Sequence, residues 1–180
     1  MKFVLPCKEY EQKAIDYIRE FYEYGSAING TGNLDGYLKE RNYSEWLLKI
    51  QADRDIANVP ENKVPAYTYF YVREAENEDK NEDKIIGMIN IRLALNDYLR
   101  SEGGHIGYSI RPTERKKGYA TQMLREALIF CRAIGLHDFI ITCDKDNPAS
   151  AGVIKNCGGM LDAEFYSDYF NEVIQRYIIK

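Results

Sequence analysis

The sequence predicts an α/β domain built on a mixed sheet whose central strands are parallel. Hydrophobic residues recur at helical spacing in the first third of the chain and alternate with a period of two after Pro65. Farther on, a strand, a helix and a second strand follow one another between residues 105 and 143, which is the pattern of a βαβ unit. Because no repeat, Pro-rich linker or low-complexity block divides the 180 residues, we expect a single domain over residues 1–180.

The first third of the chain is expected to be helical. Ala14, Ile18 and Phe21 fall on one face of a helix over residues 10–24. A second helical stretch runs from about residue 34 to residue 56. These helices precede the first predicted strand.

A hairpin follows Pro65. Residues 66–72 and 85–93 alternate in polarity as strands do, and an acidic stretch over residues 74–83 joins them. We expect this stretch to be a charged tip exposed to solvent. Tyrosines at every second position of the first strand lie on one face, where they either pack on a helix or line a pocket.

The second half of the chain alternates strands with helices. A strand over residues 105–110 precedes a helix from Gly118 to about Ile134, and residues 139–143 form an apolar run typical of a buried strand. A short helix then begins at Asn147 and Pro148, since asparagine is a common N-cap and proline suits the first helical position. Strands over residues 160–166 and 173–179 end the chain.

The distribution of charge excludes one class of partner. With 24 Lys and Arg against 28 Asp and Glu the net charge is −4, and residues 74–83 alone hold six carboxylates and one lysine, so the other residues sum to +1. No run of Lys and Arg exceeds three residues, whereas duplex binding rests on several phosphate contacts. We therefore expect no nucleic-acid partner.

Other classes are excluded by the apolar runs and the cysteines. The N-terminal apolar run of four residues is too short for a signal peptide, and no run approaches a membrane span, so we expect a cytoplasmic protein without a membrane partner. The four cysteines form no C-x-x-C pair and only two histidines accompany them, so we expect neither a disulfide framework nor a metal site.

An anion site is predicted where the strand over residues 105–110 leads into its helix. Arg115, Lys116 and Lys117 precede the helix N-terminus, which exposes N–H groups and a partial positive charge. Gly118 and Ala120 are small enough for a phosphate to approach the backbone. An ordinary solvated loop is the alternative. The Walker, Rossmann and G-x-S-x-G motifs are missing from the sequence.

Two motifs together resemble the GNAT family of N-acetyltransferases. The family's R/Q-x-x-G-x-G/A signature is met by Arg115, Gly118 and Ala120, and its N-x-x-A/S helix is met by Asn147 and Ser150. The order of helices and strands is also similar along most of the chain, least so before Pro65. The resemblance implies a GNAT-like domain: a twisted mixed sheet with a central, splayed pair of parallel strands, flanked by helices.

The resemblance implies acetyl transfer from acetyl-CoA to a primary amine of a small molecule or peptide, by direct attack. The residues expected to hold the CoA are Ile110, Arg115, Lys116, Lys117, Gly118, Tyr119, Ala120, Thr121, Asn147 and Ser150. A strand N–H near Ser109 or Ile110 would stabilise the oxyanion. A homodimer is left open, and a CoA-binding sensor or interaction module with little catalysis is the alternative function.

One position departs from the family. Ile154 stands where the family often has a tyrosine that protonates the departing thiolate, and isoleucine cannot donate a proton. The candidates for catalytic groups are therefore His105 as base and Tyr108 as proton donor. Glu102 or a water chain as base, and Tyr166 as donor, are the alternatives.

Overall fold

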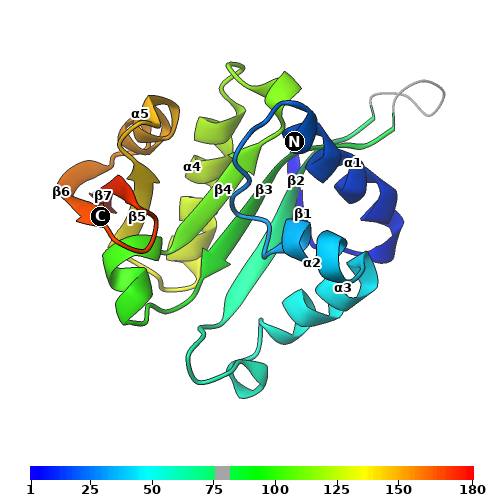
Figure 1. Cartoon of the computed structure of the whole chain (residues 1–180), viewed down its shortest axis with the longest axis horizontal. Coiled ribbons are helices and arrows are strands. Elements are labelled where there is room, and N and C mark those ends of the chain that lie inside the picture. Colours follow the sequence, from blue (N-terminus) through cyan, green and yellow to red (C-terminus); the bar gives the residue numbers. More distant parts are fainter. Residues whose placement is uncertain (76–81) are drawn as a thin grey trace.

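The computed structural model describes residues 1–75 and 82–180 (Figure 1). The acidic stretch expected at the hairpin tip falls largely on residues 76–81, outside the described residues.

The strands form two antiparallel sheets. The first sheet has the order β1-β2-β3-β4 and the second has the order β5-β7-β6. The strands of the first sheet are β1 (Lys2–Val4), β2 (Ala66–Arg73), β3 (Lys84–Arg92) and β4 (Ile106–Ile110). Those of the second are β5 (Phe139–Asp144), β6 (Met160–Ser167) and β7 (Glu172–Ile179).

Helices cover both faces of the first sheet (Figure 1). The helices on one face are α1 (Glu11–Glu23), α2 (Leu34–Glu40) and α3 (Tyr43–Ala52). On the other face, α4 (Tyr119–Ala133) connects β4 to β5. The helix α5 (Pro148–Asn156) connects β5 to β6 and packs against α4 and β5. In the described part of the chain, no helix has the length and apolar composition needed to cross a bilayer.

Alternation along the strands divides the buried side chains between two cores. Phe70 and Met88 pack with the first three helices around Trp46. Their sequence neighbours Tyr71 and Ile89 face the other way and pack with α4. Side chains of successive strand residues point to opposite faces, so one hairpin supplies both cores.

The tyrosines on β2 settle one of the alternatives left open by the sequence. Tyr69 packs edge to face on Phe130 of α4, and the hydroxyl of Tyr71 donates to Glu126 of the same helix at 3.0 Å. This face of β2 therefore packs on a helix.

The predicted elements are confirmed from β2 to β7, and two corrections fall in the first third of the chain. The helix expected over residues 34–56 is two helices, because Asn42 caps a new one: its side chain accepts the N–H of Glu45 at 2.9 Å. The strand β1 was not predicted, since three residues are too few to show a period, yet it pairs with β2.

Candidate functional site

The turn before α4 has the shape of an anion site. Lys116 and Gly118 both adopt left-handed backbone conformations, with φ of +62° and +82°. Alternating conformations of this kind turn successive N–H groups towards one concavity. The first helical bond joins the N–H of Gln122 to the carbonyl of Gly118, so the N–H groups of residues 119–121 precede the helical ladder. Gly118 has no side chain to cap them.

The approach to these N–H groups is open. A Cβ placed on Gly118 would meet no atom within 4 Å. The space over the turn can therefore admit a phosphate, as predicted from the small residues of the motif.

Two of the three cations before the helix are bonded inside the protein. Lys117 donates to Glu114 at 2.8 Å, and Arg115 donates through Nε to the carbonyl of Ile110 at 3.1 Å. The guanidinium of Arg115 also lies 5.4 Å from the ring centre of Phe21. These side chains brace the turn, so the groups of the turn that remain free to meet an anion are mainly those of the main chain.

Glu114 connects the turn before α4 to the first sheet through ion pairs, and no pattern in the sequence identified this residue. Its side chain is only 5% exposed and receives Lys84 and Lys117 at 2.8 Å and Arg73 at 3.3 Å. Burial alone would raise the pKa of this carboxyl, but the bonds from Lys117 and Lys84 and the charge of Arg73 hold its pKa at about 2. One carboxylate thus joins β2 and β3 to the turn.

The Glu114 cluster predicts a pH dependence of stability. Because its folded pKa is depressed, its contribution is complete above an unfolded value of about 4.3 and is lost as pH falls towards 2. We expect Glu114→Gln to lower the melting temperature at pH 7 more than at pH 3. Thermal unfolding at both values measures this, and equal losses at the two pH values would contradict it.

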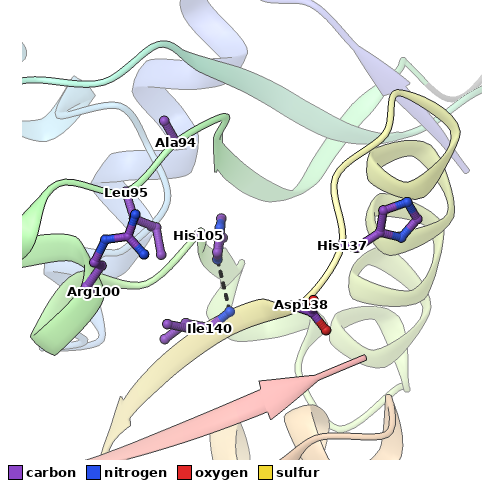
Figure 2. Close-up of a pocket in the computed structure, with 7 residues that line it drawn as sticks. All are labelled: Ala94, Leu95, Arg100, His105, His137, Asp138 and Ile140. Carbon is purple, nitrogen blue, oxygen red and sulfur yellow. Dashed lines mark hydrogen bonds between the residues drawn. The ribbon is translucent and has the colours of Figure 1, made fainter.

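β4 and β5 begin side by side and belong to different sheets. The N–H of His105 donates to the carbonyl of Ile140 at 2.7 Å, and the N–H of Ile140 donates to Nδ1 of His105 at 2.9 Å (Figure 2). β5 then pairs with β7, and β4 pairs with β3. The two strands diverge from this junction, as expected for the splayed pair.

The divergence of β4 and β5 leaves a gap between the two strands. The register of β4 shows which of its main-chain N–H and C=O groups face this gap. The main-chain N–H of Arg92 donates to the carbonyl of His105, and the main-chain N–H of Arg111 donates to the carbonyl of Ile86. In an antiparallel ladder every second residue exchanges these bonds, so Tyr108 and Ile110 direct their N–H and C=O groups away from β3. An extended ligand can add to this edge as a strand does. Ser109, the alternative oxyanion donor, points its N–H towards β3.

Tyr108 and Ser150 meet across the gap. The phenol oxygen of Tyr108 lies 2.9 Å from Oγ of Ser150 on α5. Burial raises the pKa of Tyr108, although the bond with Ser150 lowers it, so the phenol keeps its proton at neutral pH. Asn147 is the predicted N-cap of this helix, since its Oδ1 accepts the N–H of Ser150 at 3.0 Å.

The remaining sequence candidates lie in different surroundings. Ile154 is fully buried in the core beneath α5, so its position supplies no proton donor. Nδ1 of His105 accepts a main-chain N–H, which leaves the ring proton of the neutral imidazole on Nε2. Burial lowers the pKa of His105 and favours this neutral form. A base needs a lone pair on the open nitrogen, so the geometry is unfavourable for that role.

Two hollows lie near β4. A small one of about 360 Å³ lies beside His105, where Arg100, His137 and Asp138 also line it (Figure 2). A larger cleft of about 1050 Å³ lies under the loop over residues 28–33, which crosses β4. Within residues 1–75 and 82–180, no group of three or more His, Cys, Asp or Glu side chains is arranged to hold a metal ion.

Glycine lets the loop over residues 28–33 lie directly on β4. A Cβ on Gly30 would come within 2.4 Å of the carbonyl oxygen of Gly107 and 2.5 Å of Cα of Tyr108. Ser109 also bonds to this loop, at the carbonyl of Asn29. The helix spacing alone could not reveal this contact, although the three glycines between the first two helices, Gly25, Gly30 and Gly32, signal an unusual loop.

Gly30→Ala is expected to lift this loop. Gly25 provides a matched control, because it also has a positive φ but a Cβ there would meet no atom within 4 Å. Both substitutions introduce backbone strain, and only the one at Gly30 must displace main-chain atoms. We expect Gly30→Ala to lower the melting temperature by about 4–8 °C more than Gly25→Ala, from an overpacking cost of about 2 kcal/mol. Equal melting temperatures would contradict the contact.

Comparison with known proteins identifies a family. Residues 33–160 match the family described as "Acetyltransferase (GNAT) domain", which is more than half of the chain. No curated protein matches the sequence.

Solved structures share the fold over nearly the whole chain. Ribosomal-protein-S5-alanine acetyltransferase from Vibrio fischeri is 17% identical with a TM-score of 0.68, over 98% of this chain and 91% of that one. Microcin C7 self immunity acetyltransferase MccE, in complex with acetyl-CoA and AMP, is 19% identical with a TM-score of 0.61, over 98% and 90%. A dodecameric spermidine N-acetyltransferase from Vibrio cholerae is 16% identical with a TM-score of 0.59, over 99% and 92%.

Proposed function

Because the chain belongs to the GNAT acetyltransferase family, we propose that it transfers the acetyl group of acetyl-CoA to a primary amine by direct attack. The proposal depends on two structural features that follow one another along residues 106–121. The unpaired edge of β4 leads into the open N–H groups at the start of α4. A nucleotide diphosphate with an extended, amide-bearing arm suits this succession. The acetyl-CoA named for MccE supports the same co-substrate.

The proposal assigns each part of the co-substrate to a part of the chain. The N–H groups of Gly118, Tyr119, Ala120 and Thr121 would hold the diphosphate, with Lys116 adding positive charge. Tyr108 and Ile110 would pair with the pantetheine arm through their main-chain groups. Asn147 caps α5, and we propose that Asn147 and Ser150 also contact CoA.

The chemistry proceeds without a covalent enzyme intermediate. The amine nitrogen attacks the thioester carbon, so a C–N bond forms and the C–S bond breaks. The N–H of Ile110 or Tyr108 would donate to the oxyanion. The ammonium proton passes to water or to a base, and the thiolate takes a proton from the Tyr108 phenol, which Ser150 orients. Tyr108 thus serves in the role that Ile154 cannot fill.

We propose that His105 positions the start of β5, and the pH profile of a variant decides between this role and the role of base expected from the sequence. Its ring pairs with the start of β5 as a strand carbonyl would. His105→Asn keeps an acceptor near Ile140 and has no group that titrates near pH 6. We expect the acidic limb of kcat/KM to keep its wild-type midpoint in this variant. Disappearance of that limb would identify His105 as the base.

Thiol release is the direct test of the proposed function. The full chain is mixed with acetyl-CoA and a panel of primary amines that includes amino acids, peptides and polyamines, and free thiol is followed. At least one amine is expected to accelerate thiol release and to gain an acetyl group, which mass spectrometry detects. Tight binding of acetyl-CoA without turnover across the panel would favour the CoA-binding module, the alternative that the apolar Ile154 supports.

Three broader properties accompany the proposal. Residues 1–180 would act as one unit, since the large cleft is lined from Ile28 to Tyr169. A cytoplasmic location would suit an enzyme that uses acetyl-CoA. One structural neighbour, the spermidine enzyme, is a dodecamer, which suggests self-association as a property to test. A homodimer of this chain would show a mass of twice 20.9 kDa in light scattering.

A further inference from the structure

The large cleft lies on the face of the first sheet that is opposite to α4. Asn90 and Arg92 point into it from β3, on the face that packs with the first three helices. The neighbouring Ile89 and Ile91 face α4, whose N-terminus carries the anion site. A co-substrate that reaches the gap from α4 leaves this opposite face for the amine. The aromatic rings of Tyr98 and Tyr169 form part of its wall.

Arg92 brings a positive charge close to the reacting edge of β4. Its Nη1 donates to the carbonyls of Gly103 and Gly104, at 2.6 and 2.9 Å. Its Nη2 lies 3.5 Å from the place where a Cβ of Gly107 would stand. Gly107 directly precedes Tyr108, whose main chain faces the gap. The guanidinium therefore lies beside Gly107, together with Gly30 of the loop over residues 28–33, whose N and Cα are 3.5 and 3.6 Å from the same place.

This guanidinium has only neutral partners within residues 1–75 and 82–180. The hydrogen bonds of its guanidinium go to carbonyl oxygens, and none of the ion pairs in that part of the chain includes Arg92. Burial lowers the pKa of Arg92, and no carboxylate among the described ion pairs offsets this effect. An arginine can bind a carboxylate through two parallel bonds, and Nε and Nη2 of Arg92 make no hydrogen bond within residues 1–75 and 82–180.

The rest of the cleft is almost balanced in charge. Besides Arg92 it contains two lysines, Lys49 and Lys63, and two carboxylates, Asp35 and Asp53, whose charges cancel, so Arg92 gives the whole cleft a net charge of +1. Lys49 and Asp53 pair with each other at 2.5 Å. A polyamine such as the spermidine named for one structural neighbour would bring several positive charges to a surface that is already positive. A single carboxylate on the acceptor would balance it.

We propose that the acceptor is an amine that carries a carboxylate close to its amino group, as α-amino acids do, and that Arg92 binds this carboxylate. The inference rests on the proposed function and specifies its substrate class. Bonding of the carboxylate to Nη2 and Nε holds the neighbouring amine where the loop over residues 28–33 crosses Gly107, next to the strand residue that would face the thioester. The acceptor side chain then extends towards Tyr98 and Tyr169, whose ring centres are 5.2 Å apart.

A pair of product-like ligands isolates the carboxylate. N-acetylglycine and N-acetylglycinamide differ only in that group, and both are titrated into the ¹⁵N-labelled full chain saturated with CoA, with amide shifts as readout. We expect the carboxylate to bind at least about tenfold tighter than the amide in the wild type. Arg92→Gln should reduce this ratio to below twofold, and Arg92→Lys should reduce it at least threefold, since a point charge cannot make the paired bonds.

A charge-matched control separates Arg92 from the general charge of the cleft. Lys63→Gln removes one positive charge from the same cleft and should change the ratio by less than twofold. Equal binding of the two ligands by the wild type, or an unchanged ratio in both Arg92 variants, would overturn the inference. If Arg92→Gln does not fold, the wild type and Arg92→Lys decide. Failure of the wild type to bind CoA would instead contradict the proposed function.

Discussion

Gly118→Glu is expected to weaken acetyl-CoA binding at least about 100-fold while the protein stays folded. The new carboxylate would stand over the N–H groups that begin α4, where a Cβ on Gly118 meets no atom within 4 Å. At about 5 Å from a singly charged phosphate, with an effective dielectric constant of about 20, the repulsion is about 3 kcal/mol. Calorimetric titration with acetyl-CoA measures the loss.

Two controls separate the charge from the backbone strain. Gly118→Ala carries the same left-handed strain, about 1–2 kcal/mol, without the carboxylate. Gly135→Glu places a glutamate at φ of +88°, also with no atom within 4 Å of its Cβ, after the far end of α4. We expect both to fold as Gly118→Glu does and to bind acetyl-CoA within about fivefold of the wild type. An unchanged affinity in Gly118→Glu would place the diphosphate elsewhere.

Tyr108→Phe is expected to lower kcat about 100-fold and to leave the affinity for acetyl-CoA within threefold of the wild type. The variant removes only the phenol oxygen that meets Oγ of Ser150, and general acids of this kind contribute about two orders of magnitude or more. The main chain of residue 108, which would pair with the pantetheine arm, is unchanged. Steady-state kinetics with the best amine of the panel measures kcat.

Tyr71→Phe is the matched control for this variant. It removes a phenol that donates to Glu126 on the α4 side of the sheet, away from the gap. Its kcat should stay within twofold of the wild type. If Tyr108→Phe behaved in the same way, the thiolate would take its proton from water or from another group.

The parts of the site that the sequence predicted are local. The helix that follows Gly118 and the cap at Asn147 are specified by residues within four positions of one another, so spacing was enough to find them. The break between α2 and α3 is local too, but one capping residue inside a long periodic stretch gives a weak signal.

The parts that the sequence did not predict depend on distant contacts. Glu114 collects Lys84 and Arg73 from two other strands, and Gly30 touches β4 although it lies nearly eighty residues earlier. The junction of His105 with Ile140 depends on how two sheets meet. A periodic pattern of residues along the sequence carries no information about such distant contacts. The wall of the large cleft likewise combines loops whose partners follow from the fold alone.

A structure of the chain with bound acetyl-CoA tests the central proposal most directly. We expect the diphosphate within hydrogen-bond distance of the N–H groups of residues 118–121. The pantetheine arm should pair with the main chain of Tyr108 and Ile110, and the acetyl group should open towards the cleft that contains Arg92. A diphosphate bound away from the start of α4, or an arm that leaves this edge of β4 unpaired, would contradict the account.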